Sequence, residues 1–313
     1  MNKMISLVVT LVCVSVSTMA LSQRNINADS IRVAFAIPEL SYAVVQADSI
    51  PVMHAFGYHS VMSKDTASLN DRFHIGSNTK AMTAYLIAKY VEKGNLTWQT
   101  HFFDLYPEWK LSSNPAFYNI TLLDLLSHRS FVQPFQGFED PEIPAFTGSK
   151  QLRRSLFGKF VLTLPVAKKD SLSDFVYSNA GYTLAALMLE KATGKSWEEL
   201  VIRVFNDEMH LNVQFSWPDN QTKKDTWGHY FDNGQLIPVP SNTDFLIDYT
   251  EPAGDINLPF KDYVKFIQLH LQGLNGMKNY LDASTYQLLL QGISGYSLGW
   301  FNIDENGRSL VYT

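Results

Sequence analysis

The sequence predicts an α/β fold of the α+β type, with strands early and late in the chain and mostly helices between them. Segments rich in β-branched and aromatic residues cover residues 31–36, 41–45, 51–58, 296–303 and 308–313. Residues 79–93, by contrast, contain no proline or glycine and are rich in alanine, leucine and methionine. This order predicts a discontinuous architecture, in which early and late strands enclose a helical middle.

The early strands are expected to form a hairpin, because the polar run Gln46-Ala47-Asp48 has the composition of a turn between the second and third strand segments. The helix that follows is expected to begin near Ser77 and to end at Gly94, a residue favoured just past a helix end. Residues 81–88 are uncharged and apolar nearly all round, which predicts that this helix is buried.

The middle of the chain carries helix signals on either side of one long loop. Thr121 with Asp124, and Ser196 with Glu199, have the three-residue spacing of a capping box. Residues 131–150 contain Pro134, Gly137, Pro141, Pro144 and Gly148, and we expect a loop there at the rim of the functional site. Further helices are expected at residues 180–191, 260–271 and 283–290, and a turn at 305–307.

The composition argues against several classes of function. The formal net charge is −5 and no basic stripe is present, so nucleic-acid binding has no support. The single cysteine, Cys13, lies within the first 20 residues, which leaves no disulfide or thiolate site for the rest of the chain. The 8 histidines include no H-E-x-x-H pair, so we expect no metal site and no cofactor.

The N-terminus has the pattern of an export signal. Lys3 is followed by an apolar run from Met4 to Val16, and Thr18 and Ala20 supply the small residues that a signal peptidase reads. We therefore expect a cleavable signal peptide at residues 1–20 and a periplasmic or secreted mature protein. The apolar run is too short for a comfortable membrane span and no later segment is long enough, so no stable membrane span is expected.

Two residues on one predicted helical turn have the chemistry of acyl transfer. Ser77 and Lys80 are three positions apart, so a helix beginning at Ser77 places the lysine amine beside the serine hydroxyl. A lysine in an apolar site loses its charge readily and can then take the serine proton, which activates the hydroxyl as a nucleophile. The S-x-x-K pattern is short, and alone it favours a lysine that snorkels at a helix start.

A second motif about a hundred residues later reverses that preference. Tyr177-Ser178-Asn179 has the form Y-x-N. A tyrosine near a lysine cation can become more acidic and relay a proton, which makes Tyr177 the third candidate catalytic residue. Asn179 is expected to orient Lys80 or an amide of the substrate. The same run could also cap the following helix through Ser178 or Asn179.

Two other patterns receive a structural interpretation. Residues 295–299 read G-x-S-x-G, the nucleophile elbow of α/β-hydrolases, but a strand is predicted after Ser297 where the elbow needs a helix, and no histidine follows. Ser297 is therefore interpreted as part of a strand start. His128 is interpreted as a partly buried histidine bonded to the backbone, with catalysis as the alternative.

Five segments carry a resemblance to a known family: Phe73–Lys80 around Ser77, Leu125–Ser130, Phe175–Tyr182, Pro252–Gly254 and Tyr296–Trp300. In this order they resemble landmarks of the serine β-lactamase and penicillin-binding superfamily, in the branch of class C β-lactamases, D-alanyl-D-alanine carboxypeptidases and related esterases. Phe131 stands where that family usually has glycine. The resemblance covers the chain from about residue 37 to residue 313.

The resemblance implies one antiparallel sheet, made by the early and late parts of the chain and flanked by helices, with an inserted, mostly helical lobe. The sheet part is expected at about 30–98 and 250–313, and the lobe at about 99–249. The family's third motif, Lys-Thr-Gly or His-x-Gly, is expected shortly after Trp300 and is not found there. We therefore expect the catalytic domain, residues 21–313, to be C-terminally truncated, without its last strands, and inactive as it stands. The alternative is a natural protein that has lost the third motif.

The function implied is that of a secreted serine hydrolase that acts through an acyl-enzyme on an amide, a β-lactam or an ester. Ser77, Lys80 and Tyr177 are the expected catalytic residues, and Asn179 the expected substrate-binding residue. The expected partner is a small-molecule or peptidoglycan-like substrate. The alternative is a catalytically impaired protein that binds peptidoglycan or a β-lactam without turnover.

Overall fold

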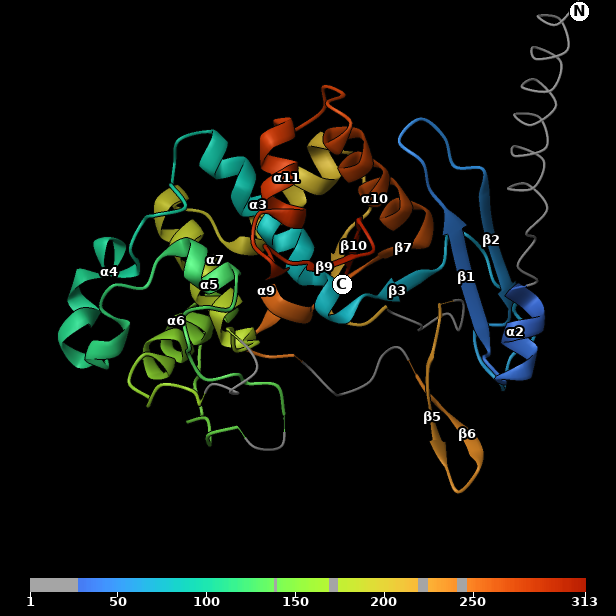
Figure 1. Ribbon diagram of the computed structural model, residues 1–313. Helices are drawn as coiled ribbons and strands as arrows, with labels where there is room; N and C mark the ends of the chain where they lie inside the picture. The colour runs from blue at the N-terminus through green and yellow to red at the C-terminus, as the bar shows by residue number, and fades with distance from the viewer. Residues whose placement is uncertain (1–27, 138–139, 169–173, 219–224, 241–246) are drawn as a thin grey trace, which may run out of the picture.

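The computed structural model describes residues 28–137, 140–168, 174–218, 225–240 and 247–313, so the expected signal peptide at residues 1–20 lies outside the described residues. Its helices (Figure 1) are α2 (Ala28–Ala34), α3 (Thr79–Glu92), α4 (Phe102–Leu105), α5 (Leu122–Leu126), α6 (Lys150–Val161), α7 (Asn179–Thr193), α8 (Trp197–Val201), α9 (Glu251–Gly254), α10 (Phe260–Leu274) and α11 (Ala283–Gln291). The 3₁₀ helices are η1 (Gly76–Asn78), η2 (Pro107–Ser112) and η3 (Pro115–Phe117), and η4 (Ile202–Glu208) is a π-helix.

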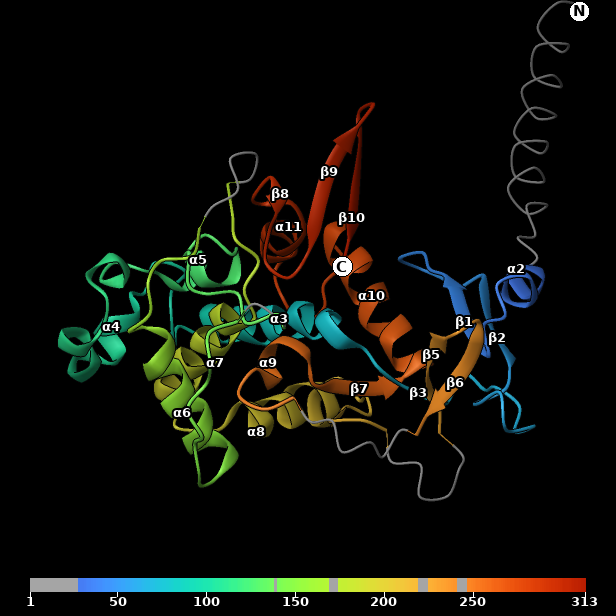
Figure 2. The ribbon, with the colours of Figure 1, turned by 90° about the horizontal axis from the view of Figure 1, so that it is seen from below.

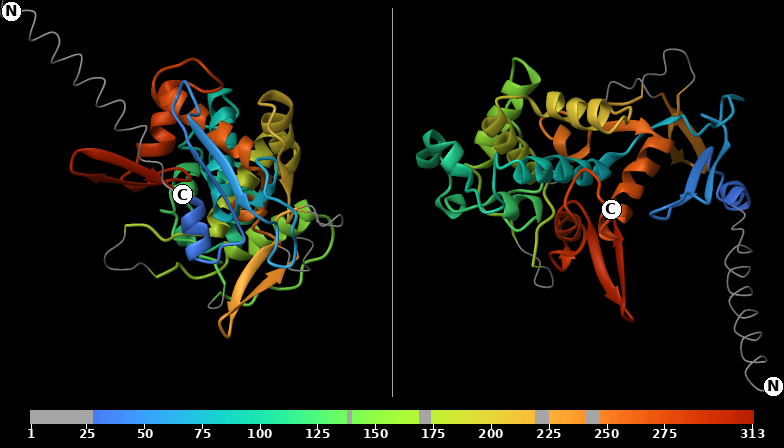
Figure 3. Two further views of the ribbon diagram at one scale, coloured as in Figure 1. Left: turned by 90° about the vertical axis from the view of Figure 1, so that its right-hand side faces the viewer. Right: turned by 90° about the horizontal axis from the view of Figure 1, so that it is seen from above.

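The strands are β1 (Glu39–Val44), β2 (Val52–Gly57), β3 (Arg72–His74), β4 (Gln214–Phe215), β5 (Gly228–Asp232), β6 (Gln235–Val239), β7 (Ile256–Pro259), β8 (Gly295–Tyr296), β9 (Phe301–Glu305) and β10 (Arg308–Tyr312). They pair as β1–β2, β5–β6, β3–β7–β4 and β8–β9–β10, and every pairing is antiparallel. The predicted hairpin of the early strands is confirmed as β1–β2. Hairpins β5–β6 and β9–β10 project from the body of the molecule (Figure 3).

Helix α3 forms the centre of the fold. Each of its residues from Thr79 to Tyr90 is buried, and it packs against α7, α8, α9 and α11. The chain leaves the helix through Gly94, whose φ of 78° lies in the left-handed region that glycine adopts without strain. The predicted buried helix is confirmed. Its N-terminal end holds the preceding residue Ser77 next to the core.

The pairing of β3 with β7 joins an early and a late part of the chain, with Phe73 opposite Leu258. Discontinuity was expected, but the single sheet was not found: β1–β2 and β8–β9–β10 lie in separate sheets. Helix α10 lies between them (Figure 2). Its Gln268 and Gln272 side chains donate hydrogen bonds of 3.1 and 3.0 Å to carbonyls in the β1–β2 turn, so α10, rather than β10, contacts that hairpin.

Three local predictions need correction. The strand expected at 31–36 is instead the end of helix α2, where an Asp29–Arg32 ion pair of 2.6 Å spans one turn. The strand expected at 296–303 is interrupted between β8 and β9, because Gly299 lies in the left-handed region with φ 88°. Helix α6 was not predicted.

Among the described helices, none combines the length and apolar character needed to cross a membrane.

Gly299 lies close to the backbone of helix α3. A Cβ atom at this position would lie 2.5 Å from the Cα atom of Ala81. We expect Gly299→Ala to destabilise the protein more than Gly307→Ala by about 1–3 kcal/mol, because the new methyl group overlaps α3 backbone. Gly307 is the matched control, since its φ of 73° is also positive but no atom lies within 4 Å of its added Cβ. Urea unfolding measures both, and equal losses would contradict this account.

Candidate active site

Ser77 lies in η1, the single 3₁₀ turn that leads directly into α3. Gly76 before it has a φ of 51°, so the backbone turns sharply where β3 meets the helix. Ser77 is exposed, whereas Lys80, on the first turn of α3, is almost completely buried. The predicted helical spacing is therefore present, and it points the lysine inward beneath an accessible hydroxyl.

The Lys80 amine has three polar neighbours. Its Nζ atom lies 3.1 Å from Ser77 Oγ, 2.7 Å from Asn179 Oδ1 and 2.9 Å from the carbonyl oxygen of Ala253. Burial of the amine lowers the pKa of Lys80 from 10.5 to about 7, because the charged form is poorly solvated there. A large fraction of the amine is thus neutral near pH 7 and able to accept the Ser77 proton.

Tyr177 lies against the same amine. Lys80 Nζ sits 4.6 Å from the centroid of the Tyr177 ring, and the phenol faces the Ser77 side chain. The pKa of Tyr177 is raised, chiefly because the phenol is desolvated, and the Ser77 side chain offsets this only in part. The prediction of a more acidic tyrosine is therefore wrong. A phenol that keeps its proton is suited to donate one, while Lys80 is the better acceptor.

The Tyr177–Asn179 segment combines both predicted roles. Ser178 is the N-cap of α7 and accepts a hydrogen bond from the Gly181 amide at 3.0 Å. Asn179 begins α7, accepts from Lys80 through Oδ1, and donates through Nδ2 to the Phe135 carbonyl at 2.7 Å. Capping and orientation of Lys80 thus occur in one segment, on adjacent residues.

His128 packs against the Tyr177–Asn179 segment and hydrogen-bonds to its backbone. It is fully buried, and its Nδ1 accepts a 3.1 Å hydrogen bond from the backbone amide of Ser178. Its ring centroid lies 4.4 Å from that of Tyr177. Burial lowers the pKa of His128 well below its usual value, and the Lys80 and Arg129 charges add to this effect. His128 is therefore a neutral, backbone-bonded residue, and it is more deeply buried than we expected.

The family model described as Beta-lactamase matches residues 28–306. The chain belongs to the beta-lactamase family. The resemblance to the class C-like serine β-lactamase and penicillin-binding superfamily is thereby confirmed. Three of the motif segments also come together in space, since Ser77, Tyr177 and Ala253 surround the Lys80 amine.

Similar proteins include protein flp of Staphylococcus aureus strain N315, 24% identical over 281 residues, which cover 88% of this chain and 54% of flp. Penicillin-binding protein 4 of Amycolatopsis lactamdurans is 25% identical over 235 residues, 73% of this chain and 58% of that protein. This beta-lactamase family chain therefore spans somewhat more than half the length of these relatives.

Solved structures with a similar fold include the following two. The octameric penicillin-binding protein homologue from Pyrococcus abyssi has a TM-score of 0.68 at 20% identity, over 90% of this chain and 64% of that one. D-amino acid amidase from Ochrobactrum anthropi SV3, complexed with L-phenylalanine amide, has a TM-score of 0.68 at 18% identity, over 90% and 80%. At such identities the likeness shows a β-lactamase-like α/β fold with mixed helices and strands.

A pocket of about 340 Å³ opens at Ser77 of this beta-lactamase family chain. Its walls come from the 135–137 part of the loop, from Asn179, and from segments 247–250 and 253–254. The prediction that the 131–150 loop borders the site is therefore confirmed. The segment at 253 was recognised from the sequence only as a family landmark, and its contribution of a carbonyl to Lys80 was missed.

The end of β10 also reaches this site, because the Thr313 hydroxyl hydrogen-bonds to the side chain of Asn78. The third motif that the family places on a neighbouring strand is absent from residues 301–313 of the sequence. The expected truncation stays a prediction.

Ser297 does not belong to this site. It is completely buried, and its hydroxyl donates a 2.5 Å hydrogen bond to the Leu288 carbonyl. A turn and strand β9 follow it, so the G-x-S-x-G pattern is not a nucleophile elbow here. The structural interpretation of Ser297 is confirmed, although the residue directly follows strand β8 and does not start a strand.

A second cluster brings together Glu39, His59 and Asp71, whose potential ligand atoms all lie within 4.8 Å of one another. These three residues could hold a cation. Two of them are already paired with each other, because His59 Nε2 lies 2.9 Å from Asp71 Oδ2. Burial raises the pKa of Glu39 to about 8, with repulsion from Asp71 adding to the shift, so Glu39 is largely protonated at pH 7.

Proposed function

We propose that this chain is the catalytic region of a serine hydrolase that forms an acyl-enzyme on Ser77 from an amide, β-lactam or ester substrate. The observation that carries the proposal is the position of the buried Lys80 amine, 3.1 Å from the exposed Ser77 hydroxyl and fixed by two further oxygen contacts. A nucleophile, a base of matched pKa and a residue that orients the base are the parts that such a reaction requires.

In the first step the neutral Lys80 amine takes the proton from Ser77 Oγ, and Oγ bonds to the substrate carbonyl carbon. The Ser77 amide stabilises the negative charge that develops on the carbonyl oxygen. The bond to the leaving nitrogen or oxygen then breaks, and the leaving atom receives a proton. The Tyr177 phenol is placed to deliver it, and Lys80 restores the phenol proton. In the second half of the reaction, water takes the place of the Ser77 hydroxyl as nucleophile. It attacks the ester carbonyl carbon by the same proton transfers and releases Ser77.

The pH dependence of acylation should report the state of Lys80. Because burial lowers the pKa of Lys80 to about 7, the neutral amine increases as the pH rises through this value. We expect the acylation rate to increase between about pH 6 and 8 and then to level off, with a tenfold loss for each unit below the pKa. Stopped-flow labelling with a fluorophosphonate measures this profile. A rate that is flat from pH 5 to 9 would remove Lys80 from the role of base.

Turnover distinguishes the proposed enzyme from its alternative, a penicillin-binding protein without hydrolysis. The full-length protein should be given a chromogenic cephalosporin, a nitrophenyl ester and a D-alanyl-D-alanine peptide. Continuous product formation on at least one of them supports the hydrolase. A single stoichiometric burst followed by no further product would instead assign the site to covalent binding. Both outcomes begin with the same proposed acyl-serine on Ser77.

We also propose that the protein acts outside the cytoplasm. This rests on the leader pattern of residues 1–20 and on a peptidoglycan-like or β-lactam substrate, which is met beyond the inner membrane. N-terminal sequencing of the protein recovered from its native host should give a chain that starts near residue 21. An intact Met1 would contradict the proposal.

A further inference from the structure

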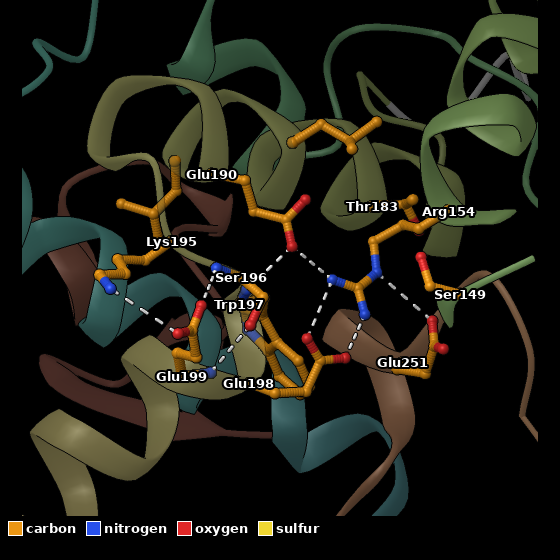
Figure 4. A network of polar contacts seen from close by, with 12 residues as sticks. Ser149, Arg154, Thr183, Glu190, Lys195, Ser196, Trp197, Glu198, Glu199 and Glu251 are labelled. Carbon is orange, nitrogen blue, oxygen red and sulfur yellow. Dashed lines mark hydrogen bonds and ion pairs between the residues drawn. The ribbon is translucent and has the colours of Figure 1, made fainter. Parts of the chain in front are cut away.

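A buried arginine that does not line the Ser77 pocket joins several helices of the described structure. Arg154 of α6 has no solvent exposure, and it contacts three carboxylates from three other helices (Figure 4). Its Nη1 atom lies 2.7 Å from Glu190 Oε1 on α7, and its Nη2 atom hydrogen-bonds to Glu198 on α8. Its Nε atom lies 3.5 Å from Glu251 Oε2 at the start of α9.

Glu251 depends on Arg154 more than the other two carboxylates do. Glu190 also accepts a 2.8 Å hydrogen bond from the Trp197 amide, and Glu198 is partly exposed to water. The Glu251 carboxylate is buried and accepts no hydrogen bond from another residue that the structure describes. Burial already raises the pKa of Glu251, and the Arg154 charge offsets this only in part, so loss of Arg154 would further favour the protonated carboxyl or its movement toward water.

Movement of Glu251 would shift the Ala253 carbonyl and, with it, the Lys80 amine beside Ser77, because α9 is only four residues long. The next two residues hold α3: the Pro252 carbonyl accepts a 2.7 Å hydrogen bond from Thr83, and the Ala253 carbonyl accepts a 2.9 Å hydrogen bond from Lys80. A continuous chain of contacts thus leads from the guanidinium of Arg154 through Glu251 and Ala253 to the Lys80 amine beside Ser77.

We propose that Arg154 is a positioning residue for Ser77 acylation, which acts by holding Glu251 and, with it, the Ala253 carbonyl that orients Lys80. The inference rests on the function proposed above. It differs from a purely structural role of Arg154 in one respect: the effect must pass through Glu251 and not through Glu190 or Glu198. Arg154 itself does not approach the substrate.

The test compares Arg154→Met, Glu251→Ala and their combination, with Glu198→Ala as the matched control. Glu251→Ala and Glu198→Ala each remove one carboxylate from the same guanidinium, but only Glu251 lies on α9. We expect Arg154→Met and Glu251→Ala each to slow fluorophosphonate labelling of Ser77 about tenfold, and the double variant to be no slower than either, because both break one contact. Glu198→Ala should stay within about twofold of the parent rate.

A second readout does not depend on activity. The ¹³Cε signal of Lys80, assigned with Lys80→Met, gives the pKa of the amine directly. We expect Arg154→Met and Glu251→Ala to lower it, because the ammonium form loses the Ala253 carbonyl. The other titratable groups that face Lys80 are Tyr177, Tyr182 and His128, and burial moves their pKa values away from neutrality, so they do not mask this titration.

The outcomes separate the two proposals. If the parent protein is not labelled at Ser77, the proposed function fails, and the Lys80 titration still decides the role of Arg154. If Glu251→Ala leaves both labelling and titration unchanged, or if the two substitutions act additively, Arg154 is only structural. Should Arg154→Met fail to fold, the Glu251→Ala and Glu198→Ala pair still tests the proposal, because equal effects of the two substitutions would overturn it.

Discussion

Lys80→Met is expected to slow acylation of Ser77 by about 10²–10⁴-fold, the range typical for loss of a positioned proton acceptor. Methionine keeps most of the side-chain volume in the buried site but carries no amine, so the Ser77 proton has no acceptor 3.1 Å away. The rate of covalent labelling by a fluorophosphonate, under excess reagent, measures the effect, and thermal unfolding of the same sample shows that the fold is kept.

Lys89→Met is the matched control for that experiment. Lys89 is also buried on α3, but its amine pairs with Glu208 at 2.9 Å and contacts nothing near Ser77 among the described residues. This variant should label at close to the parent rate. A Lys80→Met protein that labels normally would show that another group accepts the proton, and equal losses in both variants would point to general damage to α3.

Tyr177→Phe is expected to slow acylation by about 10²-fold or more, because it removes only the hydroxyl that faces Ser77. The phenylalanine ring retains the packing of the tyrosine, which lies 4.4 Å from the His128 ring and stacks on Phe301 at 6.1 Å. The raised pKa of Tyr177 means that the lost group is a proton donor at neutral pH, so the effect should be largest for substrates with poor leaving groups, such as amides.

Tyr182→Phe provides the comparison. The Tyr182 ring also lies near Lys80, 5.7 Å from Nζ, but its hydroxyl donates to the Leu126 carbonyl at 2.9 Å. This variant should lose about 1 kcal/mol of stability for the buried hydrogen bond and little of its acylation rate. Near-normal turnover on nitrophenyl ester and amide by Tyr177→Phe would reduce Tyr177 to a packing residue beside the Ser178 cap.

The features that the sequence predicted well have local causes. The buried helix after Ser77, the i, i+3 placement of Lys80 and the capping boxes at Thr121 and Ser196 depend on residues a few positions apart, and the structure contains them. The meeting of Ser77 with Asn179 came instead from family motifs, because residues a hundred positions apart carry no spacing rule of their own.

The features that were missed have tertiary causes. Helix α6 contains Gly158, which weakens its local signal, yet a Cβ there would lie 2.5 Å from Leu187, so close packing on α7 explains the glycine. With α6 unrecognised, Arg154 could not be connected to the site. The pKa of Tyr177 was misjudged in the same way: proximity to Lys80 can be guessed from motifs, but desolvation of the phenol requires the packed structure.

The central claim is that Ser77 becomes covalently acylated, and mapping of the adduct tests it most directly. The full-length protein is treated with a fluorescent penicillin and, separately, with a fluorophosphonate, then digested and examined by peptide mass spectrometry. We predict one adduct on the peptide that contains Ser77, of the mass of the opened penicillin or the phosphonyl group, and none in Ser77→Ala. Labelling that persists in Ser77→Ala, or an adduct on any other serine, would contradict the account.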